Sequence, residues 1–194
     1  MNTESECNEK SYSYYDKLFA DSPHKPVMPR EALEFIGERT GELKVIDATV
    51  GCGGHSSLIL MKYPEAVLLG LDKDERALEF AKAKLSAASG RFRLMKSRFS
   101  EIRARATDMG WLSVDAVLMD LGVSSLQLDD PSRGFSHKFD GPLDMRMGLD
   151  SENTAARILN TSSEKDLKRI FREFGEIRKA GRLAREIVAR REKM

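Results

Sequence analysis

The sequence predicts an α/β protein built on a doubly wound, parallel β-sheet. Short apolar runs alternate with amphipathic helical segments as far as Gly122, and continuous apolar runs are typical of strands covered on both faces. A glycine-rich loop follows the first run, where this fold class binds its ligands. The 194 residues, with 41% hydrophobic residues and a net charge of +1, fit a globular protein whose overall charge indicates no particular partner.

The strands and helices of this sheet are predicted in alternation. Four strands are expected at 43–48 (LKVIDA), 66–72 (AVLLGLD), 91–96 (RFRLMK) and 114–122 (VDAVLMDLG). Helices are expected between them at 55–63, 74–88 and 99–110. Asp74 is the natural N-cap of the second helix, and Gly110 ends the third.

The pattern changes after Gly122. Residues 126–150 are rich in turn formers and too long for an ordinary connection, and Phe135 and Phe139 favour a functional loop over a disordered one. Three helical segments follow at 152–160, 162–175 and 176–194, with a possible capping box at Ser163 and Asp166 and a stop at Gly175. We therefore expect a disordered leader (1–23), a ligand-binding core (24–125), a functional loop (126–150) and a helical subdomain (151–194). Within the leader, SYSYYDKLFA (11–20) is expected either to dock weakly or to serve as a lead-in.

Composition disfavours several classes of protein. Cys7 and Cys52 lie far apart and form no CxxC motif, so we expect no disulfide framework, no metal site and a reducing, cytoplasmic compartment. No apolar run approaches 18 residues, so no membrane span is expected. The segment from Arg169 to Lys193 is basic; a solvated helix face is the favoured explanation, and contact with a polyanion is the alternative.

The glycine loop lies within VIDATVGCGGHSS, residues 45–57. A dinucleotide fingerprint, GxGxxG, would place glycine where Ser56 stands, and a Walker loop would need a lysine that is absent. The loop therefore favours a nucleoside ligand without phosphates.

Acidic residues at the strand ends are candidates for binding that ligand. Asp72 can accept hydrogen bonds from both hydroxyls of a ribose, or it can cap the next helix. Asp120 is expected beside the first strand across the switch point, as a site residue or a turn former. Asp47 either holds the loop or meets an ammonium group. His55 either contacts the ligand or begins the following helix.

Several motifs together resemble one known family. HKPVMPREAL, DATVGCGGHS, LDKDERAL, DAVLMDLGVSSLQLDDPSRGFSHKFDGPLDMRM and FGEIRKAGRLAREI occur in the order seen in ribosomal RNA small subunit methyltransferase H. The resemblance implies a class I, Rossmann-like methyltransferase core with a helical insertion after the fourth strand. It also implies S-adenosyl-L-methionine as cofactor, the N4 amine of a cytidine in small-subunit (16S) ribosomal RNA as target, and that RNA or the assembled small subunit as partner.

The resemblance also assigns roles to individual residues. Cofactor contacts fall on Gly53, Gly54, His55, Asp72, Phe99, Asp120 and Gln127. Residues 133–147 would line the substrate side, Phe135 could stack on the target base, and the carboxylate of Asp120 could accept a hydrogen bond from the target amine, which makes it the candidate catalytic residue. No metal is implied.

The chain departs from the family pattern at two places. Ile177 stands where a glutamate is common, and the family continues beyond the last residue into further helices and three more strands. We therefore expect an incomplete sheet with the fourth strand at its edge, completed in the missing part or in trans. The alternative function is a truncated, non-catalytic fragment that at most binds the cofactor or RNA. A third hypothesis is a nicotinamide oxidoreductase. Ser56 disfavours it, because the dinucleotide fingerprint has glycine at that position.

Overall fold

The computed structural model describes Phe19, residues 25–148 and residues 151–191. The chain forms two compact units, Met1–Leu126 and Gln127–Met194. The first unit contains the parallel sheet and the second is mainly helical. Predictions for the remaining residues, which include nearly all of the predicted leader, lie outside the described residues.

Four parallel strands form the sheet of the first unit. They are β1 (Leu43–Asp47), β2 (Ala66–Asp72), β3 (Phe92–Lys96) and β4 (Ala116–Leu118), in the spatial order β3-β2-β1-β4. The chain runs outward from β1 to β3 and then returns to the other side of β1, so β1 and β4 flank a topological switch point. The prediction of a doubly wound, Rossmann-like α/β core is confirmed.

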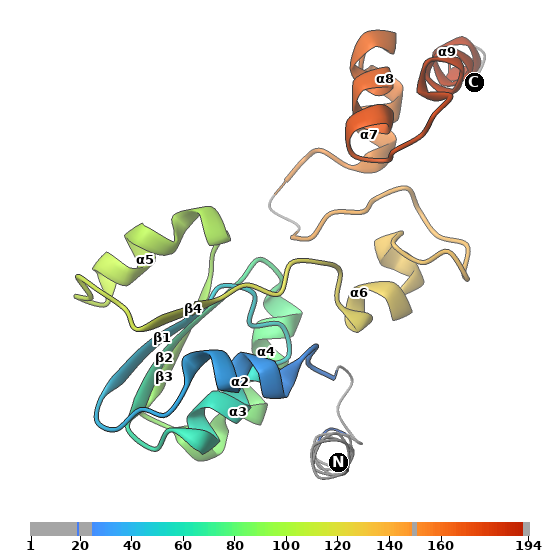
Figure 1. Cartoon of the computed structure of the whole chain (residues 1–194). Helices are drawn as coiled ribbons and strands as arrows, with labels where there is room; N and C mark the ends of the chain where they lie inside the picture. Colours follow the sequence, from blue (N-terminus) through green and yellow to red (C-terminus); the bar gives the residue numbers. More distant parts are fainter. Residues whose placement is uncertain (1–18, 20–24, 149–150, 192–194) are drawn as a thin grey trace, which may run out of the picture. The chain divides into compact units, whose positions relative to one another are not determined.

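Helices cover both faces of this sheet. They are α2 (Pro29–Ile36), α3 (Gly54–Lys62), α4 (Glu75–Lys84) and α5 (Ile102–Asp108), with short 3-10 turns at Ser86–Ala88 and Phe99–Glu101. Figure 1 shows α5 on one side of the sheet and α2, α3 and α4 on the other. The predicted N-cap is confirmed, because the Asp74 side chain accepts a hydrogen bond from the Arg76 amide at 3.1 Å.

The alternation of side chains along β1 and β2 divides the core into two layers. Val45 and Leu68 pack in one layer with residues of α2 and α3. Ile46 and Leu69 pack in the other layer with Trp111, which follows α5. All four strand residues have no solvent exposure, which explains why the strands read as continuous apolar runs rather than as alternating ones.

The structure corrects the sequence-based expectations at three places. Helix α2 was not predicted; it starts with Pro29 after Met28, which has a left-handed φ of 50°. The fourth strand is three residues long rather than nine, and Val117 remains 44% exposed because β4 pairs with β1 along one edge only within the described residues. Phe19, within the predicted disordered leader, is 2% exposed in the core, with Lys84 Nζ 4.5 Å from its ring centroid.

The second unit begins with α6 (Ser125–Asp129, which spans the boundary) and a 3-10 turn (Pro131–Arg133), and continues through a loop to α7 (Ala155–Thr161), α8 (Glu164–Glu173) and α9 (Ala180–Arg191). The Ser163 hydroxyl accepts a hydrogen bond from the Asp166 amide at 3.1 Å and caps α8. Leu167 of α8 and Ala184 of α9 are fully buried. Arg191 donates to the carbonyls of Leu159 and Ser162 at 2.9 and 2.8 Å, which joins α9 to α7.

We expect the core of the first unit to depend strongly on Leu68. Leu68→Ala removes a side chain with no exposure and should lower the free energy of unfolding by about 2–5 kcal/mol. Leu112→Ala is the matched control, because Leu112 is fully exposed, and it should change stability by less than about 0.5 kcal/mol. Urea denaturation followed by the fluorescence of Trp111, the one tryptophan, measures both; equal losses would contradict this account of the core.

Candidate functional site

The candidate site lies at the carboxyl ends of β1, β2 and β4 in the first unit. After β1 the backbone forms hydrogen bonds first with β4 and then with β2. The Ala48 amide donates to the Leu118 carbonyl of β4, and the Val50 amide donates to the Leu71 carbonyl of β2, both at 2.9 Å. The glycine loop that follows therefore emerges between two parallel neighbours. Doubly wound sheets bind their ligands at this place, in a crevice beyond the strand ends at the switch point.

Asp72, at the end of β2, holds the glycine loop. Its Oδ2 accepts a hydrogen bond from the Gly51 amide at 2.9 Å, and its Oδ1 accepts one from the Asp74 amide at 2.9 Å. Each carboxylate oxygen has a second lone pair that can accept another hydrogen bond. Burial raises the pKa of Asp72, and hydrogen bonds from backbone amides, those of Asp74 and Gly51 foremost, oppose that shift. The residue thus combines a structural role with the capacity to accept hydrogen bonds from a ligand.

Asp47 is the most deeply buried acid of the site, with 1% exposure. Its carboxylate accepts hydrogen bonds from the Ser56 hydroxyl at 2.6 Å and from the Thr49 amide at 3.3 Å. Burial raises its pKa from 3.8 to about 6, against the opposing effect of the Ser56 hydrogen bond. Of the two roles open for Asp47, these bonds support holding the loop. Ser56, which breaks the dinucleotide pattern, is the buried partner that makes this possible.

Close contacts within the protein favour glycine at positions 53 and 54. Gly53 has a φ of 80°, and a Cβ there would lie 3.2 Å from Ala81 Cα of α4. A Cβ on Gly54 would lie 3.2 Å from the ring of Pro26. From the sequence we expected these glycines to allow a ligand to approach; the structure shows that they let α4 and the segment before α2 approach the loop. Their predicted contacts with a cofactor stay a prediction.

His55, the second residue of α3, bonds to the segment that precedes α2. Its Nε2 lies 2.7 Å from the Val27 carbonyl oxygen, and the residue is 9% exposed. With Pro26 against Gly54, this bond fixes residues 26 and 27 beside the start of α3. The His55 ring therefore has a structural partner, and its predicted contact with the cofactor stays a prediction.

Asp120 and Phe99 lie beyond the ends of β4 and β3. The Asp120 amide donates to Thr49 Oγ1 at 2.7 Å, so a side chain at the end of β1 fixes this residue across the switch point, as predicted from the order of the strands. Phe99 is 50% exposed and follows Ser97, whose amide donates to the Asp72 carbonyl at 2.9 Å. Thr49 was not singled out from the sequence, because its role depends on a partner 71 residues away.

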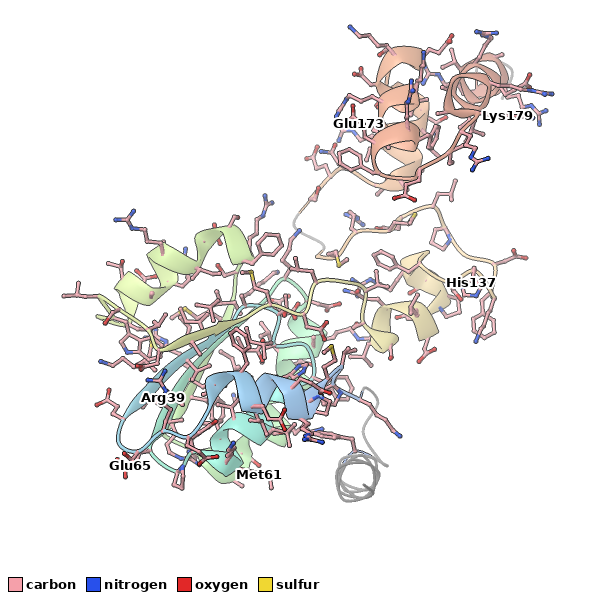
Figure 2. The ribbon with its side chains drawn as sticks, in the orientation of Figure 1. Arg39, Met61, Glu65, His137, Glu173 and Lys179 are labelled. Atoms are coloured by element: carbon pink, nitrogen blue, oxygen red, sulfur yellow. The ribbon has the colours of Figure 1, made fainter. Side chains whose placement is uncertain are left out.

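Gln127, the last predicted cofactor residue, is 5% exposed and belongs to the second unit. The loop after it is ordered by its own polar contacts. Arg146 forms two hydrogen bonds with the Asp144 carboxylate at 2.8 and 2.7 Å, and Arg133 donates to the carbonyls of residues 146 and 147. Phe135 is half-buried in this loop. His137, labelled in Figure 2, is exposed.

Two further findings bear on the kind of site. Among Phe19 and residues 25–148 and 151–191, no group of three or more His, Cys, Asp or Glu side chains is placed to hold a metal ion. Over the same part of the chain, no helix has the length and apolar character needed to cross a membrane.

We expect the buried Asp47 carboxyl to make stability depend on pH. Because its pKa is about 6 in the folded protein and 3.8 ordinarily, the folded state holds the proton more tightly, and stability falls as pH rises from about 4 through 6. Asp47→Asn can keep both hydrogen bonds and should remove up to about 3 kcal/mol of this pH-dependent loss. Urea denaturation at pH 4.5 to 7.5 measures the difference; a difference between the two proteins that is constant with pH would contradict it.

Comparisons with known proteins agree with the resemblance drawn from the motifs. Residues 21–194 match the model of the MraW methylase family. Two relatives are named ribosomal RNA small subunit methyltransferase H. The one from Solidesulfovibrio magneticus is 49% identical over 172 residues, which cover 88% of this chain and 53% of the relative. The one from Carboxydothermus hydrogenoformans is 50% identical over 170 residues, covering 88% and 54%.

The chain spans about half the length of the curated relatives that it matches. A solved structure of a putative rRNA-methylase from Clostridium thermocellum matches 49% of this chain and 55% of its own, at 18% identity and a TM-score of 0.36. The family model covers both units, from the segment before α2 to the end of α9, and the chain therefore belongs to the MraW methylase family.

Proposed function

We propose that this chain carries the cofactor-binding part of an S-adenosylmethionine-dependent methyltransferase acting on the N4 amine of a cytidine in small-subunit ribosomal RNA. One observation supports the proposal most: Asp72 holds the glycine loop by the Gly51 amide, at the same sheet edge where Thr49 holds Asp120. Family membership and the names of the relatives support the reaction class and the RNA substrate. A cytoplasmic location follows from that substrate.

The chemistry of the crevice fits this cofactor. Asp47, Asp72 and Asp120 give it three carboxyl groups at the ends of adjacent strands. Such a crevice favours a ligand with positive charge and disfavours the paired phosphates of a dinucleotide. S-adenosylmethionine carries a sulfonium and an ammonium group, and its ribose offers two hydroxyls to Asp72. The half-exposed ring of Phe99 is available to an adenine.

The residues present suggest how the target amine would be held. When bound, S-adenosylmethionine supplies an electrophilic methyl group. The lone pair of a cytosine N4 amine is delocalised into the ring, so the amine needs an acceptor that favours its pyramidal form. Asp120 is half-buried, its backbone is fixed by Thr49, and within the described part of the chain its carboxylate forms no ion pair. It can accept a hydrogen bond from the amine and align it, and alignment supplies up to about 7–11 kcal/mol in favourable reactions.

Recognition of a cytidine also requires the base to leave its stack, because the reacting atom is otherwise shielded. An aromatic ring that stacks on the released base lowers the cost of this step. Phe135 is half-buried and Phe139 is 56% exposed in the loop of the second unit. Phe139 is the more exposed of the two rings, so either ring can stack on the base.

We expect Asp72 to contribute more to cofactor affinity than its neighbour. Asp72→Asn should weaken S-adenosylmethionine binding by about 10- to 100-fold, because hydrogen bonds to a charged acceptor contribute about 1.5–3 kcal/mol. Asp74→Asn is the matched control: it removes the same charge two residues away, and asparagine is an equally good N-cap. Isothermal titration calorimetry on the whole chain measures both affinities. Equal effects of the two substitutions would contradict the assignment of Asp72.

The alternative function is binding of the cofactor or RNA without catalysis. Transfer of a tritiated methyl group to small ribosomal subunits separates the two: binding without transfer supports the non-catalytic protein. A nicotinamide oxidoreductase would instead bind NADH, which the same calorimeter detects. The buried hydrogen bond from Ser56 to Asp47 disfavours it, because the dinucleotide pattern needs a glycine at that position.

A further inference from the structure

The helix pair α8–α9 of the second unit carries an excess of positive charge. Between Glu164 and Arg191 there are ten Lys or Arg residues and five Asp or Glu residues. Figure 2 shows many nitrogen-tipped side chains projecting from these two helices, on either side of the labelled Glu173 and Lys179. The sequence alone left two explanations open, a solvated helix face and contact with a polyanion. The pairing of the individual charges decides between them.

Three of these ten basic side chains, and Arg157 of α7, are neutralised by acids of the same unit. Four arginines of the second unit form ion pairs with nearby glutamates, at nitrogen–oxygen distances between 2.9 and 3.7 Å. They are Arg157 with Glu152, Arg169 with Glu173, Arg185 with Glu164, and Arg190 with Glu186. These pairs have the mixed charges of an ordinary solvated surface.

Two contacts fix how the faces of α8 and α9 lie alongside each other. Near the start of α8, Glu164 pairs with Arg185 of α9 at 3.7 Å. One turn further along α8, the aliphatic stem of Lys168 lies 3.6 Å from the position of a Cβ on Gly181. The helices therefore run antiparallel. If the same spacing continues, Arg172 of α8 comes opposite the residues that precede Gly181.

Four basic residues are neighbours of these contacts along the chain. On α8, Lys168 and Arg172 are four residues apart and share a face. Arg182 follows Gly181 in α9, and Arg178 lies four residues earlier, in the turn tied to α8 by the hydrogen bond from the Ile177 amide to the Phe171 carbonyl at 2.9 Å. We call Lys168, Arg172, Arg178 and Arg182 the cationic stripe.

The cationic stripe differs from the paired arginines in one physical respect. Its four side chains are exposed, and among the described residues none forms an ion pair with an acid. Like charges on one helix face repel each other and destabilise the folded state. A bound polyanion would reduce this repulsion in the cationic stripe. Phe174, 74% exposed, follows Arg172 by two residues at the end of α8, and exposed aromatic rings among basic residues are typical of single-stranded RNA surfaces.

A membrane surface would require a different arrangement. Helices that lie on lipid bilayers present a continuous apolar face next to their basic one. In α8 the apolar residues are turned towards the interior: Leu167 is fully buried, and Ile170 and Phe171 are half-buried. Within α8 no apolar side chain is exposed, so this helix lacks the continuous apolar face that a bilayer needs. The exposed apolar side chains of the pair, Phe174, Ile177 and Leu183, lie at the end of α8, in the turn and in α9, and the observations favour RNA.

We propose that the cationic stripe binds the phosphate backbone of single-stranded segments of the RNA substrate. This inference rests on the proposed function, because it assumes that the substrate is RNA. It adds an RNA-binding surface on α8 and α9, outside every residue assigned to the cofactor or the target amine. Each phosphate that the stripe neutralises should release counterions and so make binding depend on salt.

The test compares two charge-matched variants of the whole chain. The first replaces the stripe: Lys168→Gln, Arg172→Gln, Arg178→Gln and Arg182→Gln. The second replaces the paired arginines: Arg157→Gln, Arg169→Gln, Arg185→Gln and Arg190→Gln. Binding to a labelled single-stranded RNA containing cytidines is measured by fluorescence anisotropy over a range of salt concentrations. Circular dichroism checks that each variant keeps its helices.

The stripe variant should lower the slope of log affinity against log salt by about 3, since each single-strand phosphate contact contributes about 0.7. The control should lower it by less than about 1. Equal decreases would overturn the proposal, because net charge alone would then explain binding. So would an unchanged slope in the stripe variant, or stripe-dependent binding to vesicles with 30% anionic lipid but not to RNA. Should the stripe variant lose its helices, single replacement of Arg182 by Gln provides the same comparison against Arg190→Gln.

Failure of this proposal is distinguishable from failure of the proposed function. Calorimetry with S-adenosylmethionine tests the first unit and does not involve the stripe. A chain that binds the cofactor, and whose affinity for RNA is insensitive to the stripe, retains the proposed function and loses this inference. A chain that binds RNA through the stripe but no cofactor retains the inference and loses the proposed methyltransferase.

Discussion

The hydrogen bond from the Gly51 amide to the Asp72 carboxylate joins the loop after β1 to the end of β2, and the rest of the site is arranged around it. The loop can reach Asp72 because the Val50 amide still pairs with Leu71 of β2. The same loop supplies Thr49, which binds the Asp120 amide beyond β4. A single turn of backbone thereby fixes acidic groups from three neighbouring strands, and parallel strands are the reason that these ends meet at one edge.

Burial of carboxyl groups in this crevice has an energetic cost that the surrounding donors offset in part. Asp47 keeps two hydrogen bonds, but burial still raises its pKa to about 6. Asp72 is shifted in the same direction for the same reason. Carboxyl groups with perturbed pKa values cluster at functional sites. A positively charged ligand would balance the negative charge of these carboxylates. For this reason we propose that the site prefers a sulfonium compound to a dinucleotide.

Local patterns in the sequence predicted the sheet well, because each strand has its own apolar run. Strand β2 has the predicted bounds, and β1 and β3 differ by one residue at one end. Helix α2 escaped prediction because its eight residues are fewer than the roughly 11–18 residues over which helical periodicity is judged. The length of β4 was overestimated because the apolar run continues past the last residue that pairs with β1.

The candidate site was predictable in its location but not in its internal contacts. Asp72 and Asp120 could be placed because strand ends converge in any doubly wound sheet. The packing of Pro26 on Gly54 and the bond between His55 and Val27 join segments 28 residues apart, and no local pattern encodes such a contact. The cationic stripe was not predictable from a local pattern either, because its residues come together only through the antiparallel packing of α8 and α9.

The central claim, that the crevice held by Asp72 binds S-adenosylmethionine, is tested most directly by nuclear magnetic resonance. Amide shifts of the isotope-labelled chain would be followed during titration with S-adenosylhomocysteine, the stable product of the proposed reaction. The account predicts shifts concentrated in residues 49–55, at Asp72 to Asp74, near Phe99 and at Asp120. Shifts absent from Gly51 and Asp72, or confined to α7, α8 and α9, would contradict it.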